Sequence, residues 1–371
     1  MTNRLEQLTV FYHDKTVGLL RCIDRRISFI YDKKWLLDGF SISPRSLPLE
    51  NRVFTADSLK YQGLFGVFAD SLPDGWGTLT TIKYLRNKGI SYLNLNPLEK
   101  LSLIGEDGLG ALSYRPSQGN ETGEWLGTLD EFFQASLDAV EGEDAEFLDT
   151  IFAKESSTGG ARPKAHIRLD GSEWIVKFRE RKDPAWMGRM EYEYNLAAKE
   201  AGMEVPEIRL LPSKDSDGYF ACKRFDRNSE GRVHALSLSG LLEVPRDLPL
   251  LDYATFLQAT GYITQSQKEV EKAFQLACFN VFSKNYDDHS KNFAFLYDDQ
   301  QKRYVLAPAY DLTRTLYQKE HEMSCNGKGL PKEDDLLAVA KKVGIPAKKA
   351  EEILLRTKTV VEIRLKEWLN K

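Results

Sequence analysis

The sequence has little of what marks metalloproteins, secreted proteins or membrane proteins. Its 371 residues include only four cysteines, with no CxxC pair and no histidine at zinc-ligand spacing: Cys22, Cys222, Cys278 and Cys325. This spacing argues against a structural zinc site and against a disulfide framework. No apolar run approaches the roughly 18 residues of a membrane helix, and the N-terminal residues lack the apolar segment of a signal peptide. We therefore expect a soluble, cytoplasmic protein that does not enter a membrane.

The chain also lacks an excess of either charge. It carries 51 Lys and Arg against 55 Asp and Glu, which gives a formal net charge of −4. Such a balance provides no overall electrostatic field that would hold nucleic acid unaided. The length of 371 residues favours two or three packed lobes over a single core. We therefore expect a multi-lobed protein that does not bind DNA on its own.

Apolar and polar residues alternate as in β-strands near the start of the chain. The alternating runs cover residues 8–13, 17–22 and 27–32, with short polar breaks between them. Over residues 58–90 the apolar spacing lengthens to that of helices, and Pro73-Asp74-Gly75 interrupts it. The pattern predicts a small β-rich module followed by two helices around a tight turn. A Gly, Asn, Thr and Glu cluster at 117–124 marks either a domain boundary near residue 125 or one long hairpin loop.

A second sheet is predicted after a short helix. Thr128 and Glu131 have the spacing of a capping box at the start of a helix over 128–140. Another helix is predicted over 189–202, and the predicted strands are 164–169, 173–178, 206–211, 219–225, 292–298 and 304–309. Helical spacing otherwise dominates the last third of the chain. The expected fold class is α+β, with three subdomains: 1–125, 126–228 and 229–371.

The segment 284-KNYDDHSKNFAFLYD-298 holds the clearest chemical signal. It follows an amphipathic helix predicted over 267–285, so its polar residues lie on a loop mounted on a buried helix. Asp287 and Asn292 have the spacing found in the protein-kinase catalytic loop, where the Asp deprotonates the acceptor hydroxyl and the Asn binds Mg²⁺. A predicted hairpin then ends at Asp311, where a kinase-like site has its second metal carboxylate. Three oxygen ligands for a hard cation thus converge.

Simpler interpretations of the same residues stay open. A loop that contains Asp287, Asp288 and Asn292 is often only a capped turn, although the following hairpin favours a site. His289 either orients the backbone through hydrogen bonds or takes part in proton transfer. Lys291 either neutralises a transferring phosphoryl group or is solvated.

Two upstream features are suited to bind phosphate. The segment 155–167 is rich in Ser, Thr and Gly, so its backbone amides can face an anion, and Lys164 lies beside them. The alternation of the strand at 173–178 puts Lys177 on the face opposite to Trp174, Val176 and Phe178. Glu191, at the start of the next helix, is its natural partner, as in the Lys and Glu pair that positions ATP phosphates in kinases. Either residue alone would be only a surface charge, but the two together predict a nucleotide-binding pair.

These motifs together resemble those of HipA-type serine/threonine kinases, the toxins of bacterial toxin–antitoxin pairs. The resemblance covers nearly the whole chain and rests on five segments: the opening module over 8–49, 68-FADSLPDGWG-77, 156-SSTGGARPKAHI-167, 285-NYDDHSKNFAFL-296 and 307-APAYDLT-313. It implies a bilobed, protein-kinase-like fold of HipA type. An N-terminal β-rich subdomain, a sheet subdomain with a Gly-rich loop and a mainly helical C-terminal lobe are expected.

The resemblance also implies roles for individual residues. The resemblance implies Asp287 as the catalytic base, Lys177 as the ATP lysine, and Asn292 and Asp311 as the Mg²⁺ ligands. Lys291, in the same loop, is a further candidate catalytic residue. The candidate ATP-binding residues are Lys177, Glu191, Ser157, Thr158, Gly159, Gly160, Lys164, Phe225 and His289. Autophosphorylation is expected at Ser157 or at Ser156, because the serine of the Gly-rich loop is doubled here.

Partners follow from the same resemblance. It implies a protein substrate, for which the known targets of the family are aminoacyl-tRNA synthetases. It also implies a small DNA-binding antitoxin of HipB type, through which alone the chain would contact DNA. Two alternatives remain: a pseudokinase or antitoxin-binding scaffold without phosphotransfer, and a metal-dependent hydrolase built on Asp287, Asp288 and His289. The intact acidic set favours the kinase, and the hydrolase would need a further metal ligand that the sequence does not place nearby.

Overall fold

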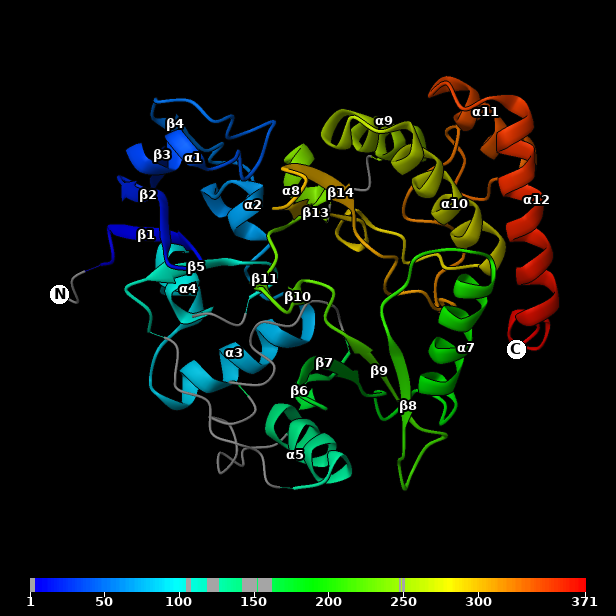
Figure 1. The fold of residues 1–371 in the computed structure, drawn as a ribbon. Coiled ribbons are helices and arrows are strands. Elements are labelled where there is room, and N and C mark those ends of the chain that lie inside the picture. The colour runs from blue at the N-terminus through cyan, green and yellow to red at the C-terminus, as the bar shows by residue number, and fades with distance from the viewer. Residues whose placement is uncertain are drawn as a thin grey trace.

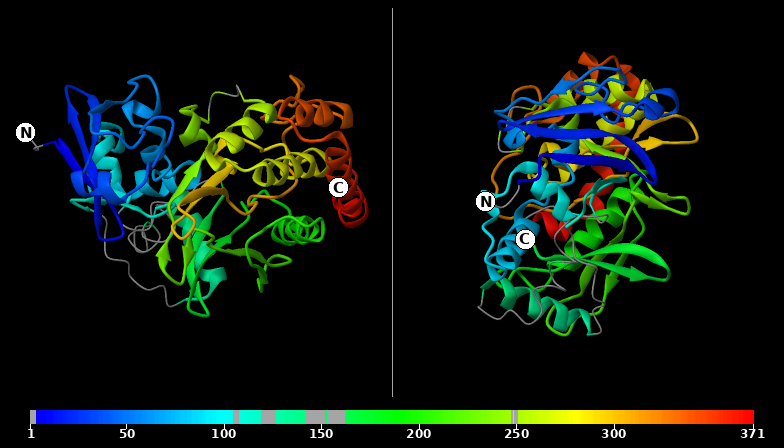
Figure 2. Two further views of the ribbon diagram at one scale, coloured as in Figure 1. Left: turned by 45° about the horizontal axis from the view of Figure 1, so that its top comes forward. Right: turned by 90° about the vertical axis from the view of Figure 1, so that its left-hand side faces the viewer.

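The computed structural model describes residues 4–104, 108–118, 127–141, 152, 162–246, 248 and 251–371. A β-rich N-terminal module lies at one side, a second sheet lies below the centre, and the C-terminal helices lie at the opposite side (Figure 1). The two chain ends are therefore far apart, as a second direction of view also shows (Figure 2). The predicted α+β class is confirmed. Within the described ranges, no helix is long and apolar enough to cross a membrane.

The N-terminal module is built on an antiparallel sheet in the order β4-β3-β2-β1-β5. Its strands are β1 Gln7–Tyr12, β2 Lys15–Ile23, β3 Arg26–Tyr31, β4 Phe54–Thr55 and β5 Leu112–Arg115. Alternate residues of β1 and β3 are buried, as the sequence pattern predicts for strands with one covered face. The helical elements of the module are α1 Lys33–Asp38, η1 Tyr61–Gly63, α2 Gly66–Ala69, α3 Gly75–Asn87, η2 Tyr92–Asn94 and α4 Pro97–Ile104.

The two helices predicted around a tight turn over 58–90 are present, but they differ in length. The first of them is only the single turn of α2. All four α2 residues are buried. The apolar residues here are therefore buried on every side, and their spacing does not report a helical face. The second helix, α3, starts directly after Asp74, as the Pro-Asp-Gly break predicts.

The second sheet has the order β6-β7-β9-β8. Its strands are β6 Lys164–Leu169, β7 Ser172–Lys177, β8 Ile208–Leu211 and β9 Tyr219–Lys223, accompanied by the helices α5 Leu129–Glu141 and α7 Met187–Glu200 and the short pair β10 Arg227–Asn228 and β11 Gly231–Arg232. The predicted capping box is present, because Thr128 N donates to Glu131 Oε2 at 2.7 Å and Glu131 N donates to Thr128 Oγ1 at 3.3 Å. Phe132 of α5 packs in the cluster that also buries Trp174 and Val176 of β7.

The C-terminal part surrounds a small sheet in the order β12-β13-β14. Its elements are β12 Ala235–Ser237, α8 Leu238–Leu242, α9 Tyr253–Thr264, α10 Gln267–Ser283, η3 Ser290–Asn292, β13 Ala294–Asp298, β14 Arg303–Leu306, α11 Glu333–Lys342, α12 Ala347–Arg364 and α13 Lys366–Leu369. Helix α10 is mostly buried and ends at Lys284, which has the left-handed conformation common at helix C-termini. The loop after this buried helix therefore has a fixed starting point.

The N-terminal module packs directly on the C-terminal part through α2 and α8, which lie side by side near the centre of the molecule (Figure 1). A methyl group placed on Gly66 would lie 2.7 Å from the Cα and carbonyl O atoms of Gly240. The amide of Gly66 donates to the Glu243 carboxylate at 3.0 Å. Asp70 accepts hydrogen bonds from Ser237 N at 2.8 Å and Ser237 Oγ at 2.6 Å. Because these backbones touch, the module is held against the C-terminal part in one position.

Candidate active site

A cavity of about 1020 Å³, measured out to its open mouth, lies where the three parts of the chain meet. The second sheet contributes Lys164, Ile175, Lys177 and Cys222; the C-terminal part contributes His289, Lys291, Asn292 and Asp311; the N-terminal module contributes Asp70, Leu72 and Asp74. Predicted site residues from distant segments of the sequence are thus brought to one place, although Asp287 and Glu191 are not among the residues that line this cavity. The N-terminal module also takes part, which the sequence did not suggest.

Lys177 lies at the centre of the charged groups in this cavity. It extends from β7 on the face opposite to Trp174 and Val176, as the alternation of the strand predicts. Its ammonium group contacts both Glu191 Oε1 on α7 and Asp311 Oδ1. Burial lowers the pKa of Lys177, but Asp311 and Glu191 outweigh this effect and hold the pKa above its usual value. Lys177 is therefore a fixed positive charge that two carboxylates hold in place.

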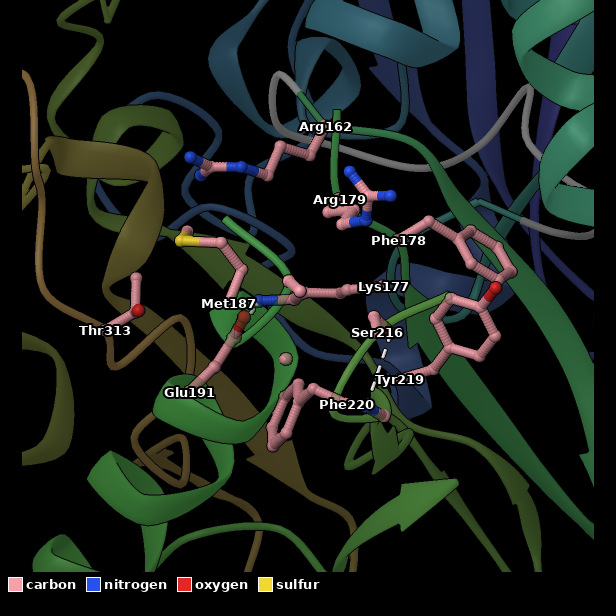
Figure 3. A pocket seen from close by; sticks show the side chains of 13 residues that line it. Arg162, Lys177, Phe178, Arg179, Met187, Glu191, Ser216, Tyr219, Phe220 and Thr313 are labelled. Carbon is pink, nitrogen blue, oxygen red and sulfur yellow. Dashed lines mark hydrogen bonds and ion pairs between the residues drawn. The ribbon is translucent and has the colours of Figure 1, made fainter. Parts of the chain in front are cut away.

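Figure 3 shows Lys177 and Glu191 pointing toward each other, from strand and helix, in a second cavity of about 420 Å³. Arg162 and Thr313 also line this cavity. Arg162 donates to Asp183 at 2.7 Å and so has a carboxylate partner of its own. The predicted pairing of Lys177 with Glu191 is confirmed, while the additional contact with Asp311 was not predicted.

Asp311 follows the β13–β14 hairpin and has a positive φ of 53°. This left-handed conformation is uncommon for a residue with a side chain and is frequent at functional sites. Burial raises the pKa of Asp311, but Lys177 and Lys164 outweigh this effect and hold the pKa far below its usual range. Burial likewise lowers the pKa of Lys164, against the effect of Asp311. Asp311 is therefore a permanently ionised carboxylate facing the cavity.

The loop after α10 is folded by hydrogen bonds to its own backbone. Asn292 Nδ2 donates to the carbonyl O of Asp287 at 2.7 Å, and Thr315 Oγ1 accepts from Asp287 N at 3.0 Å. These bonds fix the backbone at Asp287 and leave its carboxylate 43% exposed. Because Nδ2 of Asn292 is used in this way, its Oδ1 is the amide atom that remains for a cation. Asn292 and Asp311 thus offer oxygen donors of the kind that Mg²⁺ prefers.

Charged neighbours surround the Asp287 carboxylate. Arg246 Nη2 lies 3.4 Å from its Oδ1, and His289 Nε2 lies 3.7 Å from the same atom. Partial burial raises the pKa of Asp287 to about 7; Arg246 acts against this rise, whereas Glu322 and Asp311 add to it. A carboxylate with a pKa near neutrality both accepts and releases a proton readily, as a general base must.

Asp288 has a different environment from Asp287 and is fully buried. It accepts hydrogen bonds from Tyr253 OH at 2.6 Å and from the backbone amides of Glu322 and Met323 at 2.8 and 3.2 Å, and it contacts His321 Nδ1 at 2.7 Å. These bonds join the loop after α10 to the segment around residue 322. Asp288 is therefore a structural anchor. Because both of its carboxylate oxygens are engaged in these contacts, it is not suited to be the metal ligand that the hydrolase alternative requires.

His289 is the N-cap residue of the short η3 turn, and Lys291 is the middle residue of that turn. His289 Nδ1 accepts a hydrogen bond from Lys291 N at 3.2 Å, which matches the backbone-orienting interpretation. Burial lowers the pKa of His289 to about 3, so the ring is neutral at physiological pH. The Lys291 ammonium lies 3.3 Å from Asp74 Oδ2, and Tyr310 OH donates to the carbonyl O of Lys291 at 2.6 Å. Lys291 thus faces the cavity and not bulk solvent.

The segment after β9 borders the cavity on another side. The ring of Phe225 lies 5.2 Å from that of Tyr310, centroid to centroid, and both residues line the cavity. On either side of Phe225, Arg224 donates to Gly108 O at 2.9 Å and Asp226 accepts from Gly110 N at 2.7 Å. The segment thus carries an apolar ring into the cavity and is tied to the N-terminal module at the same time.

Other predicted residues lie outside the part of the chain that the structure describes. They are the Gly-rich loop residues Ser156, Ser157, Thr158, Gly159 and Gly160, and the boundary near residue 125. Three residues at the site were missed by the sequence reasoning: Asp74, Arg246 and Glu322. The sequence places Asp74 in a helix break and in the 68-FADSLPDGWG-77 segment of the family resemblance, neither of which gives it a role at the site. Neither Arg246 nor Glu322 belongs to a motif that would have singled it out.

Comparisons with known proteins show which proteins this chain is similar to. The family models for the HipA N-terminal domain and the HipA-like C-terminal domain match residues 8–115 and 156–364. Two proteins of Sinorhizobium fredii, named "Putative kinase Y4dM" and "Putative kinase Y4mE", are each 26% identical, over 67% and 83% of this chain. The aligned region is 62% of the length of the first and 77% of the second.

A solved structure extends the likeness to the fold. The HipA toxin–antitoxin system of Shewanella oneidensis, solved as a complex of HipA, HipB and operator DNA, contains a chain with a TM-score of 0.71 and 20% sequence identity. The match covers 98% of this chain and 91% of that one. The predicted HipA-type fold is thereby confirmed. With both family models matched in order along the sequence, the chain belongs to the HipA family.

Proposed function

We propose that this protein is an ATP- and Mg²⁺-dependent kinase that phosphorylates serine or threonine of a cytoplasmic protein. The observation that supports this most is the pairing of two differently tuned carboxylates beside one cavity. Asp311 is held ionised by Lys177, as a metal ligand requires, while the pKa of Asp287 is raised to about 7, as a base requires. A scaffold without phosphotransfer would not need two carboxylates whose pKa values are shifted in opposite directions.

The proposed mechanism gives each residue a separate task. Asp287 accepts the proton of the acceptor hydroxyl at its carboxylate, and the Asn292 side chain keeps that carboxylate in place by binding the backbone carbonyl of Asp287. Lys177, held by Glu191, binds the α- and β-phosphates. Asn292 and Asp311 would hold Mg²⁺, which when bound neutralises charge on the phosphates. Lys164 adds positive charge within the same cavity.

Two further residues assist without reacting. His289 is neutral and serves to hold the η3 turn through the Lys291 amide. Phe225, beside Tyr310, is placed to cover the base of the nucleotide with an apolar ring. Lys291 has a different task, because its ammonium is proposed to stabilise the transferring phosphoryl group.

The Gly-rich loop is proposed to bind the β- and γ-phosphates through backbone amides near Thr158, Gly159 and Gly160. Autophosphorylation of Ser157, or of Ser156, would place about −1.5 to −2 charges beside the nucleotide phosphates and Asp311, and so weaken nucleotide binding. Intact-mass measurement after incubation with Mg·ATP should show one added phosphate in the wild type and none in a variant with both serines replaced by alanine. Equal ATP affinity in the modified and unmodified protein would contradict this switch.

Partners are proposed from the family. The related Shewanella system contains HipB and operator DNA, so we propose a small HipB-like antitoxin as the partner of this chain and DNA contact only through it. The proposed substrate is a protein of the class of aminoacyl-tRNA synthetases, and the proposed location is the cytoplasm. Toxicity on expression without the antitoxin would follow from the same assignment.

A phosphotransfer assay tests the central proposal. Purified protein is incubated with γ-labelled ATP, with and without Mg²⁺, and label on protein is measured beside free phosphate. We expect label on protein only with Mg²⁺, and its loss in Asp287→Asn, while nucleotide affinity measured by calorimetry persists. Asp38, an exposed carboxylate of the N-terminal module, provides the control Asp38→Asn. Undiminished transfer in Asp287→Asn would reject Asp287 as the base, and free phosphate without protein label would favour a hydrolase.

A further inference from the structure

Asp74 brings a carboxylate of the N-terminal module into the proposed phosphotransfer cavity. It belongs to the LPDGW segment between α2 and α3, and it lines the cavity together with Lys291 and Asn292. Its Oδ2 lies 3.3 Å from the Lys291 ammonium, and both side chains are about four-fifths buried, with exposures of 22% and 21%. The two residues are 217 positions apart in the sequence. This ion pair is thus a direct link from the N-terminal module to the catalytic loop.

The side chain of Asp74 does not cap the helix that follows it. Asp74 is the N-cap residue of α3, yet it makes no side-chain cap hydrogen bond, and no acidic residue stands in the first turn of that helix. Asp32 offers a comparison within the same module, because it is the N-cap of α1 and accepts from Lys34 N at 2.8 Å. Aspartate at an N-cap usually stabilises the helix by accepting such a hydrogen bond from a backbone amide of the first turn. The Asp74 carboxylate is turned toward Lys291 instead.

The backbone before Asp74 is rigidly supported. Four residues earlier, Asp70 is buried and accepts two hydrogen bonds from Ser237, at 2.8 Å and 2.6 Å. The turn that carries Asp70 begins at Gly66, whose close approach to Gly240 leaves no room for a side chain. A carboxylate on so short and well-anchored a segment has little freedom to leave the cavity.

Lys291, in contrast, is fixed at its backbone and needs a partner for its side chain. Its amide is held by His289 and its carbonyl O by Tyr310. The four-carbon stem of a lysine has many rotamers, and ordering it costs conformational entropy. The rigid Asp74 carboxylate restricts the ammonium to positions that face the cavity. The geometry therefore suits preorganisation of Lys291 before a phosphoryl group arrives.

We propose that Asp74 is a positioning residue for phosphoryl transfer: it holds the Lys291 ammonium where the transferring phosphoryl group will be, and so makes the N-terminal module a part of the active site. This inference rests on the kinase function proposed above. Asp74 itself does not touch the reacting atoms. It acts through Lys291. During transfer, negative charge develops on the phosphoryl oxygens, and the Lys291 ammonium donates hydrogen bonds to them.

A double-mutant cycle on the full chain tests this positioning role. The kcat and the KM for ATP are measured for the wild type, Asp74→Ala, Asp74→Asn, Lys291→Met and the combination Asp74→Ala with Lys291→Met. We expect Asp74→Ala to lower kcat by about tenfold and to change the KM for ATP by less than about twofold. Asp74→Asn, which keeps an oxygen acceptor, should recover part of the loss. In the Lys291→Met background, Asp74→Ala should have no further effect.

Two measurements without turnover separate positioning from a structural role. The affinity for ADP, which lacks the transferring group, should be the same in Asp74→Ala and the wild type by calorimetry. The thermal midpoint of Asp74→Ala should change little, because the variant loses the ion pair with Lys291 but no helix-cap hydrogen bond. The matched control Asp32→Ala does lose a cap bond, and should lower the midpoint by about 2 °C without changing kcat.

The outcomes distinguish this inference from the proposal on which it rests. A wild type that transfers no phosphate would refute the kinase function and the inference with it. An active wild type would refute the inference alone if Asp74→Ala left kcat unchanged, or if the losses from Asp74→Ala and Lys291→Met multiplied independently. A joint fall of thermal midpoint and ADP affinity in Asp74→Ala would assign Asp74 a structural role and would also overturn the inference.

Discussion

Replacing Arg246 should move the pH profile of the enzyme toward the alkaline side. Asp287 must be ionised to accept a proton, and its pKa of about 7 places the acid limb of kcat/KM near neutrality. Burial is the main cause of this raised pKa, and Arg246 is the group that opposes it most. In Arg246→Gln the opposing charge is lost, so the pKa rises further and activity is lost at a higher pH than in the wild type.

The size of this shift follows from the geometry of the pair. Arg246 Nη2 is 3.4 Å from Asp287 Oδ1, and the two side chains are 33% and 43% exposed. For charges so accessible to solvent, a water-like dielectric gives an interaction of about 1.2 kcal/mol at that separation. This energy corresponds to a pKa change of about 0.9. We therefore expect the limb to move from near pH 7 to near pH 8 in Arg246→Gln.

Initial rates at low ATP concentration, measured between pH 5.5 and 9.5 at constant ionic strength, give the profile of kcat/KM for the free enzyme. Glu322→Gln provides the opposite change, since Glu322 raises the pKa of Asp287, and it should move the limb to lower pH. Arg52→Gln serves as the control, because Arg52 pairs with Glu50 at the surface of the N-terminal module. Identical limbs in Arg246→Gln, Glu322→Gln and the wild type would refute the assignment of this ionisation to Asp287.

Three other predictions concern the metal site, the fold and DNA. Asp311→Ala should weaken Mg·ATP binding by at least about tenfold in calorimetry, since it removes the ionised carboxylate beside Lys177; unchanged affinity would reject Asp311 as a ligand. Asp288→Ala should lower the free energy of unfolding by about 3 kcal/mol in urea titrations, because it strands the buried partners Tyr253 and His321; a loss as small as that of the exposed-site variant Asp38→Ala would contradict this. The chain alone should show only weak, salt-sensitive DNA binding in fluorescence anisotropy, whereas tight sequence-specific binding would refute the need for an antitoxin.

Local patterns in the sequence were sufficient for much of the site. The alternation of β7 put Lys177 on the cavity face, and its pairing with Glu191 followed from their positions on a strand and the next helix. The five-residue interval between Asp287 and Asn292 likewise located a loop whose geometry is fixed within a few residues by a side-chain bond to the backbone. These features depend on short-range structure, which sequence patterns report directly.

The contacts that the sequence did not reveal are long-range ones. Asp74 and Lys291 meet only because α2 is docked on α8, and nothing in either local pattern specifies that docking. Arg246 reaches Asp287 from 41 positions away, on a segment without regular structure. The different fates of Asp287 and Asp288 are a matter of burial, since adjacent carboxylates of the same type point into different surroundings.

The glycine contact between α2 and α8 bears on how such proteins can be recombined. Gly66 and Gly240 lie in different sequence regions, yet a side chain on Gly66 would meet the backbone of Gly240, and a side chain on Gly240 would meet the Asp70 carboxylate that follows α2. A chimaera that takes its N-terminal module from one relative and its catalytic part from another must therefore keep small residues at both positions. An alanine at either position would displace the LPDGW segment from the cavity. Compatible donors could be chosen by these two positions before any variant is built.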